Sequence, residues 1–73
     1  MRNNKTVDEL VRIAKAGGGL EVDAGKLTTD EIVRIALAGS GNRVRLEVGN
    51  ANRLATDELV RIALASKGTV HFS

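Results

Sequence analysis

The sequence predicts an α/β fold of two layers, in which three helices alternate with three parallel strands in the order αβαβαβ. The first observation is a repeated heptapeptide. Asp-Glu-Leu-Val-Arg-Ile-Ala occupies residues 8–14, returns with one Leu-to-Ile change at residues 30–36, and returns unchanged at residues 57–63. The second observation is a change in the spacing of hydrophobic residues. Each copy opens a stretch with the 3.6-residue spacing of a helix, and the two-residue alternation of a strand follows it.

The helices are expected at residues 7–16, 29–38 and 56–66. Two of them follow the Thr-x-x-Glu spacing of a capping box, Thr6 with Glu9 and Thr28 with Glu31, in which each side chain satisfies an amide of the first turn. The third has Ala55 at the cap position, so we expect it to start less firmly. The helices are expected to stop at glycines, namely Gly17, Gly39 and Gly68.

The strands are indicated by apolar residues that alternate with polar ones: Leu20, Val22 and Ala24; Val44, Leu46 and Val48; Val70 and Phe72. Right-handed crossovers of this length predict parallel strands in the order 1-2-3, with the three helices on one face. Two registers remain open between the first two strands. Alignment by length sets Glu21 beside Arg45, which is electrostatically better, whereas alignment of the two Leu-Glu-Val runs sets Glu21 beside Glu47.

One strand and the turn after it resemble a known family. The run Leu-Glu-Val-Asp-Ala-Gly-Lys-Leu at residues 20–27 resembles the strand signature of leucine-rich repeats, L-x-L-x-x-N-x-L, with Gly25 in place of the Asn. The second unit, at residues 46–54, has one residue more than the signature. The resemblance implies a curved stack, or solenoid, whose exposed strand face is the binding surface, and it assigns a role to no individual residue.

Length and composition limit the classes of protein. The chain is expected to be one domain, residues 1–73, made of unit 1 (6–27), unit 2 (28–54) and unit 3 (55–73). No Cys and a single His exclude disulfides and thiolate metal sites, and we expect no cofactor. A net charge of +2 with interspersed signs makes nucleic acid an unfavoured partner. No run reaches the ~18 apolar residues of a membrane span and residues 1–5 lack a signal-peptide core, so a cytoplasmic, or purely recombinant, protein is expected.

The near identity of the heptapeptides bears on the origin of the chain. Natural repeats diverge at solvent-facing positions, yet Asp, Glu and Arg recur in every copy. This indicates either a recent duplication or a consensus or de novo design.

Three groups of residues approach a functional motif without completing it. Gly25-Lys26 approximates a phosphate-binding loop, but Leu27 stands where Ser or Thr is required, so we predict a simple turn. His71 has no nearby nucleophile or second metal ligand and is expected on an exposed strand. The last group is an arginine in each unit, preceded four residues earlier by an aspartate, a spacing that predicts local ion pairs: Arg12 with Asp8, Arg34 with Asp30, and Arg61 with Asp57.

These observations predict a non-enzymatic scaffold that self-associates. A terminal unit needs a polar outer side to stay soluble, and helix 1 has Lys15 where helix 3 has Leu64. We therefore expect a two-fold homodimer through unit 3, with this interface: Val60, Leu64, Val70 and Phe72. The alternative is a module that binds a protein partner through the open polar face of the sheet, which carries these residues: Glu21, Asp23, Arg45, Glu47 and His71.

Overall fold

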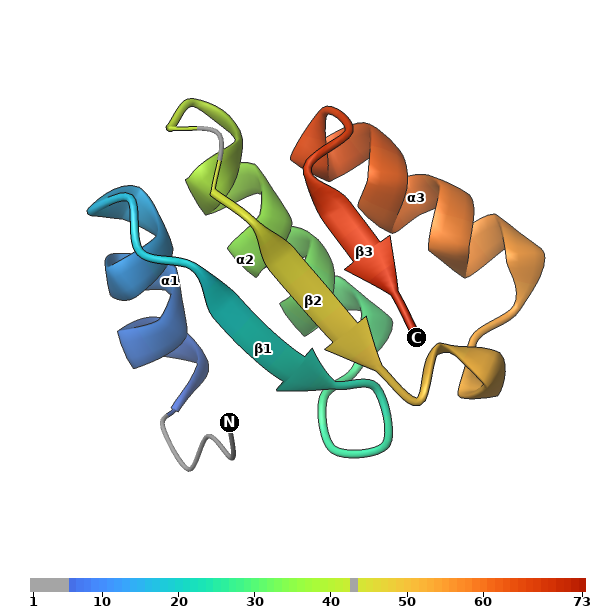
Figure 1. The fold of residues 1–73 in the computed structure, drawn as a ribbon. Coiled ribbons are helices and arrows are strands. Elements are labelled where there is room, and N and C mark those ends of the chain that lie inside the picture. The colour runs from blue at the N-terminus through green and yellow to red at the C-terminus, as the bar shows by residue number, and fades with distance from the viewer. Residues whose placement is uncertain (1–5, 43) are drawn as a thin grey trace.

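The computed structural model describes residues 6–42 and 44–73, so the expectation about residues 1–5 lies outside the described part. Helices and strands alternate along the chain. The elements are α1 (Val7–Lys15), β1 (Leu20–Asp23), α2 (Thr29–Ser40), β2 (Leu46–Gly49), the 3-10 helix η1 (Ala51–Arg53), α3 (Thr56–Ser66) and β3 (Val70–Phe72). The strands are parallel and lie in the order β1-β2-β3, which confirms the predicted α/β fold class (Figure 1).

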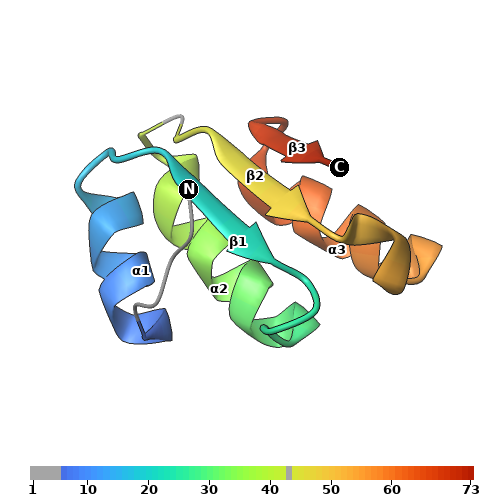
Figure 2. The same ribbon diagram turned by 60° about the horizontal axis from the view of Figure 1, so that its bottom comes forward.

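The molecule has two layers. All three helices lie on one face of the sheet, with α1 and α3 on the two outer sides and α2 between them (Figures 1 and 2). Side chains from both layers meet in one apolar core, and its buried members are Leu10, Ala14, Leu20, Val22, Ile32, Ile35, Ala36, Leu46, Val48, Ile62 and Ala65. The opposite face of the sheet is not covered by any element that the structure describes.

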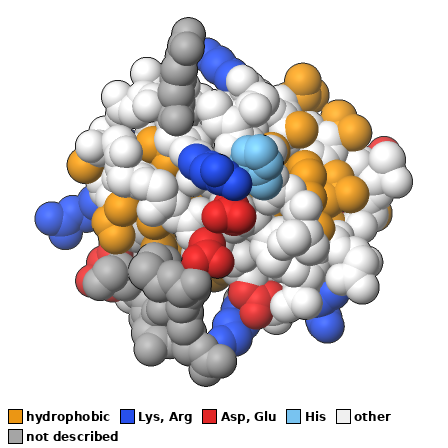
Figure 3. Space-filling view, in the orientation of Figure 1, with side chains coloured by type: hydrophobic (Ala, Val, Ile, Leu, Met, Phe, Trp, Pro, Cys, Tyr) orange, Lys and Arg blue, Asp and Glu red, His pale blue; other side chains and the backbone are white. Residues whose placement is uncertain are grey.

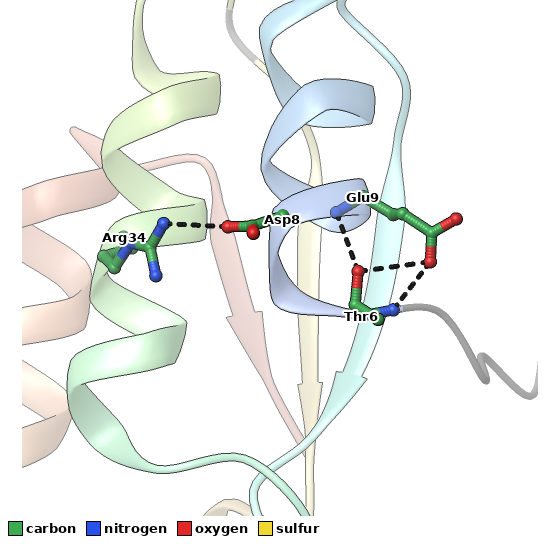
Figure 4. A network of polar contacts seen from close by, with 4 residues as sticks. All are labelled: Thr6, Asp8, Glu9 and Arg34. Carbon is green, nitrogen blue, oxygen red and sulfur yellow. Dashed lines mark hydrogen bonds and ion pairs between the residues drawn. The ribbon is translucent and has the colours of Figure 1, made fainter.

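The helices begin where the capping boxes predict. The amide of Glu9 donates to Oγ1 of Thr6 over 3.2 Å, and the amide of Thr6 donates to Oε1 of Glu9 over 2.9 Å (Figure 4). The same two bonds open α2. Ala55 is the N-cap of α3 and offers no side-chain acceptor, so only the bond from its amide to Oε1 of Glu58, at 2.8 Å, remains. The third helix therefore starts with half of a capping box.

The glycines stop two helices but not the third. Gly17 after α1 and Gly68 after α3 have φ of +92° and +88°, the left-handed conformation that glycine adopts without strain. The prediction that Gly39 ends the second helix is wrong. Gly39 lies buried inside α2, and a Cβ built on it would be 2.8 Å from Cβ of Val44. This glycine gives the chain room to pack Val44 against the helix on its way to β2.

The register that the charges favour is also wrong. Glu21 pairs with Glu47 and not with Arg45, because the two Leu-Glu-Val runs lie side by side. In this register Leu46 and Val48 are 2% and 0% exposed. The two registers differ by two residues, so both keep the same apolar side chains on the core face. In the observed register Leu20 lies beside Leu46 and Val22 beside Val48, and the cross-strand charge pair, worth only about 0.2–1 kcal/mol, does not set the pairing.

Candidate functional site

The open face of the sheet gathers acidic, basic and histidine side chains over its middle, and hydrophobic side chains flank this cluster (Figure 3). Its members come from all three strands or from the residues just before them: Glu21, Asp23, Arg45, Glu47 and His71. Three of these residues, Arg45, Glu47 and His71, are exposed, and the other two are half-buried. The predicted set thus lies together on one surface.

Neighbouring strands place the members of this face in rows. Glu21 lies beside Glu47, and Glu47 lies beside His71. Arg45 precedes β2, and its Nε lies 4.0 Å from Oε2 of Glu47, at the outer limit of an ion pair. Like charges directly opposite on adjacent strands are unfavourable. Among the described residues, this face therefore carries three carboxylates together with Arg45 and His71.

Asp23 makes two hydrogen bonds within the protein. Its Oδ1 accepts a hydrogen bond from Nδ2 of Asn50 and another from the amide of Gly25, both at 2.7 Å. These two bonds, the one from Asn50 first, hold the pKa of the Asp23 carboxyl below its ordinary value of 3.8. Asp23 therefore ties the turn after β1 to the turn after β2, and this oxygen is engaged within the protein.

Sequence reasoning missed Asn50. This residue has φ of +57°, in the left-handed region that asparagine tolerates better than most residues. The Gly-Asn pair at residues 49–50 is a common turn signal and could have indicated the turn. It could not have indicated the partner, because Asp23 lies in another unit.

The turn that contains Gly25 and Lys26 does not present its amides to a ligand. The amide of Lys26 donates to the carbonyl of Asp23 over 2.9 Å, and the amide of Leu27 donates to the same carbonyl over 3.1 Å. The amide of Gly25 is bound to the Asp23 side chain. A phosphate loop needs such amides to point at the phosphate. The geometry is that of a closed turn, as the sequence predicts.

The ion pairs run between helices, and the predicted pairs within each helix are wrong. Nη2 of Arg34 lies 3.2 Å from Oδ1 of Asp8, which joins α2 to α1 (Figure 4). Nη2 of Arg61 lies 2.8 Å from Oδ1 of Asp30, which joins α3 to α2. The reason is geometric, because helices packed side by side bring each arginine to the aspartate of the preceding unit. These pairs neutralise Arg34 and Arg61 and leave no continuous basic column.

Comparisons with known proteins identify no relative: the chain matches no family model, and neither a curated protein nor a solved structure is significantly similar to it. Among the described residues, no helix has both the length and the apolar character to cross a membrane. In the same part of the chain, no three His, Asp or Glu side chains lie close enough to hold a metal ion.

The end of unit 3 carries exposed apolar side chains. Val60 and Leu64 on α3 are 49% and 74% exposed, and Phe72 on β3 is 36% exposed. Val70 is half-buried against the core. Leu37, which occupies in α2 the position of Leu64, is 56% exposed, so this position points partly away from the neighbouring helix in every unit. The predicted interface residues thus lie at one end of the molecule. Val33, the equivalent of Val60 in α2, packs against the core beside α3, so a further helix beside α3 would cover Val60 more than Leu64.

Proposed function

We propose that this chain is a non-enzymatic repeat protein, stacked as a short solenoid, which self-associates through the end of unit 3. The observation that carries the proposal is the apolar surface of α3, where Val60 and Leu64 are exposed beside the edge strand β3. At the corresponding position of the first helix the chain has the charged Lys15, which is exposed to solvent. Unit 1 therefore has a charged side chain at the position where unit 3 has an exposed leucine.

The size of the effect supports association. Fully burying an aliphatic side chain contributes about 1.5–3 kcal/mol, and Val60 and Leu64, which are 49% and 74% exposed, would each contribute part of that when a second copy covers them. A core of this size typically supplies about 3–5 kcal/mol in total. β3 adds a second attraction, because an edge strand offers main-chain groups to another strand, and neither Pro nor Lys interrupts residues 70–72. A two-fold dimer is the simplest closed form of such an assembly.

Sedimentation analysis over a range of concentrations tests the proposal. We expect the parent protein to associate as its concentration rises and Leu64→Lys, which copies the residue of unit 1, to weaken that association strongly. Leu37→Lys is the matched control, because it removes the leucine that occupies the same position in the middle helix and is also more than half exposed. A parent protein that stays monomeric at millimolar concentration would overturn the proposal. Equal effects of the two substitutions would show that the apolar helical surface as a whole, and not the end of unit 3, drives association.

The second candidate function is protein binding through the open sheet face. It is favoured by the mixed cluster of exposed charges and His71 on a face that no described element covers (Figure 3). A binding module of this kind would remain monomeric until its partner is supplied. Because three of the five described members of this face are carboxylates, the expected partner has a basic surface, and Glu47→Lys is expected to weaken its binding without changing self-association.

A further inference from the structure

The contacts between neighbouring units follow one pattern. Asp8 of unit 1 binds Arg34 of unit 2, and Asp30 of unit 2 binds Arg61 of unit 3. In each case the aspartate belongs to the earlier unit and the arginine to the later one. Each unit therefore presents an acidic group to the unit that follows it and a basic group to the unit that precedes it.

This pattern leaves one charge of each sign at the two ends. Within residues 6–42 and 44–73, no unit precedes Arg12 of α1 and none follows Asp57 of α3. Both are exposed, and neither forms an ion pair or a side-chain hydrogen bond with any residue in 6–42 or 44–73. The two charges are complementary, and they occupy the positions that pair with each other inside the molecule.

The outer side of α1 carries residues whose equivalents in α3 face a neighbouring helix. A hollow open to solvent lies there, lined by Glu9, Arg12, Ile13 and Ala16. The equivalent side chains of α3 form the side that contacts α2, and they are Glu58, Arg61, Ile62 and Ala65. Ile62 and Ala65 are buried there, whereas Ile13 is half-buried and Ala16 is exposed. The hollow thus matches, position by position, a surface that is covered elsewhere in the same molecule.

The outer side of α3 carries the residues that fill such a surface. Inside the molecule, α2 turns Asp30 toward α3, and Val33, one turn further on, packs against the core. The equivalent residues of α3 are Asp57 and Val60, and Val60 is 49% exposed. The edge strands of the sheet are β1 and β3. The edge at β1 lies on the side of α1, and the edge at β3 lies on the side of α3 (Figure 1).

We propose that the end of unit 3 docks onto the outer side of α1 in a second copy of this chain, with Asp57 bound to Arg12. The proposal rests on the self-association proposed above and names its geometry, because it continues the helix-to-helix contact that already joins units 1, 2 and 3. A contact between two different surfaces is heterologous, so each docked pair keeps one free α1 side and one free unit-3 end. Such an assembly grows into rings or chains, whereas a two-fold dimer through unit 3 stops at two copies and leaves α1 unused.

Two charge reversals separate these arrangements. Arg12→Asp sets like charges against each other at a head-to-tail contact, and so does Asp57→Arg. We expect each variant alone to associate about tenfold more weakly or worse. An equimolar mixture is expected to recover the association of the parent, because each junction in the mixture brings opposite charges together again. Measurements at about 0.15 M salt, where the Debye length is about 8 Å, limit attraction due to net charge alone.

The controls decide between the two proposals. Lys26→Asp makes the same change of charge at an exposed turn and is expected to associate like the parent. At concentrations too low for association, thermal unfolding of Arg12→Asp should match that of the parent, because Arg12 is exposed and makes no ion pair within the described chain. Asp57→Arg should be slightly less stable, because Asp57 lies in the first turn of α3. If Arg12→Asp associates like the parent while Leu64→Lys is monomeric, the head-to-tail contact is overturned and self-association stands. Failure of the mixture to recover association also overturns the contact. A monomeric parent overturns both proposals.

Discussion

Thr29 of unit 2 donates its hydroxyl hydrogen to Glu58 of unit 3, with 2.7 Å between Oγ1 and Oε2. The other oxygen of the same carboxylate accepts the amide of Ala55, at 2.8 Å, and so begins α3. Glu58 therefore starts its own helix and ties it to α2. In unit 1 the residue equivalent to Thr29 is Val7, which has no hydroxyl group to donate. This hydrogen bond is therefore specific to the contact between units 2 and 3.

The first prediction concerns the pKa of Glu58. The hydroxyl of Thr29, followed by the amide of Ala55, holds the pKa of this carboxyl below its ordinary value of 4.5. Thr29→Val removes the hydroxyl at nearly constant shape and should raise the pKa of Glu58, as followed by NMR titration. The pKa of Asp23 is the internal control and should not move. If the pKa of Glu58 is the same in Thr29→Val as in the parent, the hydrogen bond from Thr29 does not form in solution.

The second prediction concerns Asp23. Asn50→Gly removes the donor of the hydrogen bond to Asp23 but tolerates the positive φ of this position, so the turn is retained. We expect the pKa of Asp23 to rise and the pKa of Glu58 to stay constant. In Thr29→Val the same two residues exchange roles, because there the pKa of Glu58 rises and that of Asp23 is the control.

The lowered pKa values also set the direction of the pH dependence. A carboxyl whose folded pKa is below its unfolded pKa contributes stability above the unfolded value and loses it as the pH falls through the folded value. The free energy of unfolding should therefore decline in acid from about pH 4 downward. The decline should be shallower in both Thr29→Val and Asn50→Gly, as measured by denaturant unfolding at a series of pH values.

The third prediction tests the half-built cap of α3. Ala55→Ser supplies the missing acceptor and should stabilise the protein by about 0.5–2 kcal/mol. Thr28→Ala, which removes the same acceptor from α2, should destabilise it by a similar amount. Thermal or urea unfolding measures both. No gain at residue 55 would place the start of α3 elsewhere, for example with Thr56 as the cap.

The fourth prediction uses two neighbouring glycines. Gly39→Ala should destabilise the protein, because overpacking against Val44 costs about 1–3 kcal/mol and exceeds the gain of up to about 1 kcal/mol from helix propensity. Gly41→Ala is the control. It has a helical φ of −73° and open space for a Cβ, so it should stabilise by about 0.4–1 kcal/mol. Equal effects at both positions would contradict the close contact with Val44.

The fifth prediction distinguishes ion pairs between helices from those within one. In a double-mutant cycle of unfolding free energies, Arg34→Gln and Asp8→Asn should show a coupling of about 0.2–1 kcal/mol, a small value because both side chains are more than half exposed. The coupling should shrink at high salt. A second double-mutant cycle, of Arg34→Gln with Asp30→Asn, should show almost no coupling energy. A larger coupling energy in this second cycle would show that Arg34 pairs with Asp30 within α2, as the sequence predicts.

The elements and their order follow from local sequence patterns. The capping boxes, with Glu9 and Glu31 three residues after a threonine, set the first residues of α1 and α2, and the two-residue alternation around Glu21 and Glu47 marked β1 and β2. These signals are local, since each depends on residues a few positions apart. The order of parallel strands followed as well, because short crossovers leave few alternatives.

The contacts between distant residues depend on how the units pack against one another. The register that sets Glu21 beside Glu47, the bond from Asn50 to Asp23, and the pairing of Arg34 with Asp8 all join different units. Local charge spacing favoured other partners in two of these cases. It failed because a surface charge pair contributes less than the burial of aliphatic side chains, so the core sets how the units lie and the charges then pair with whatever packing brings near.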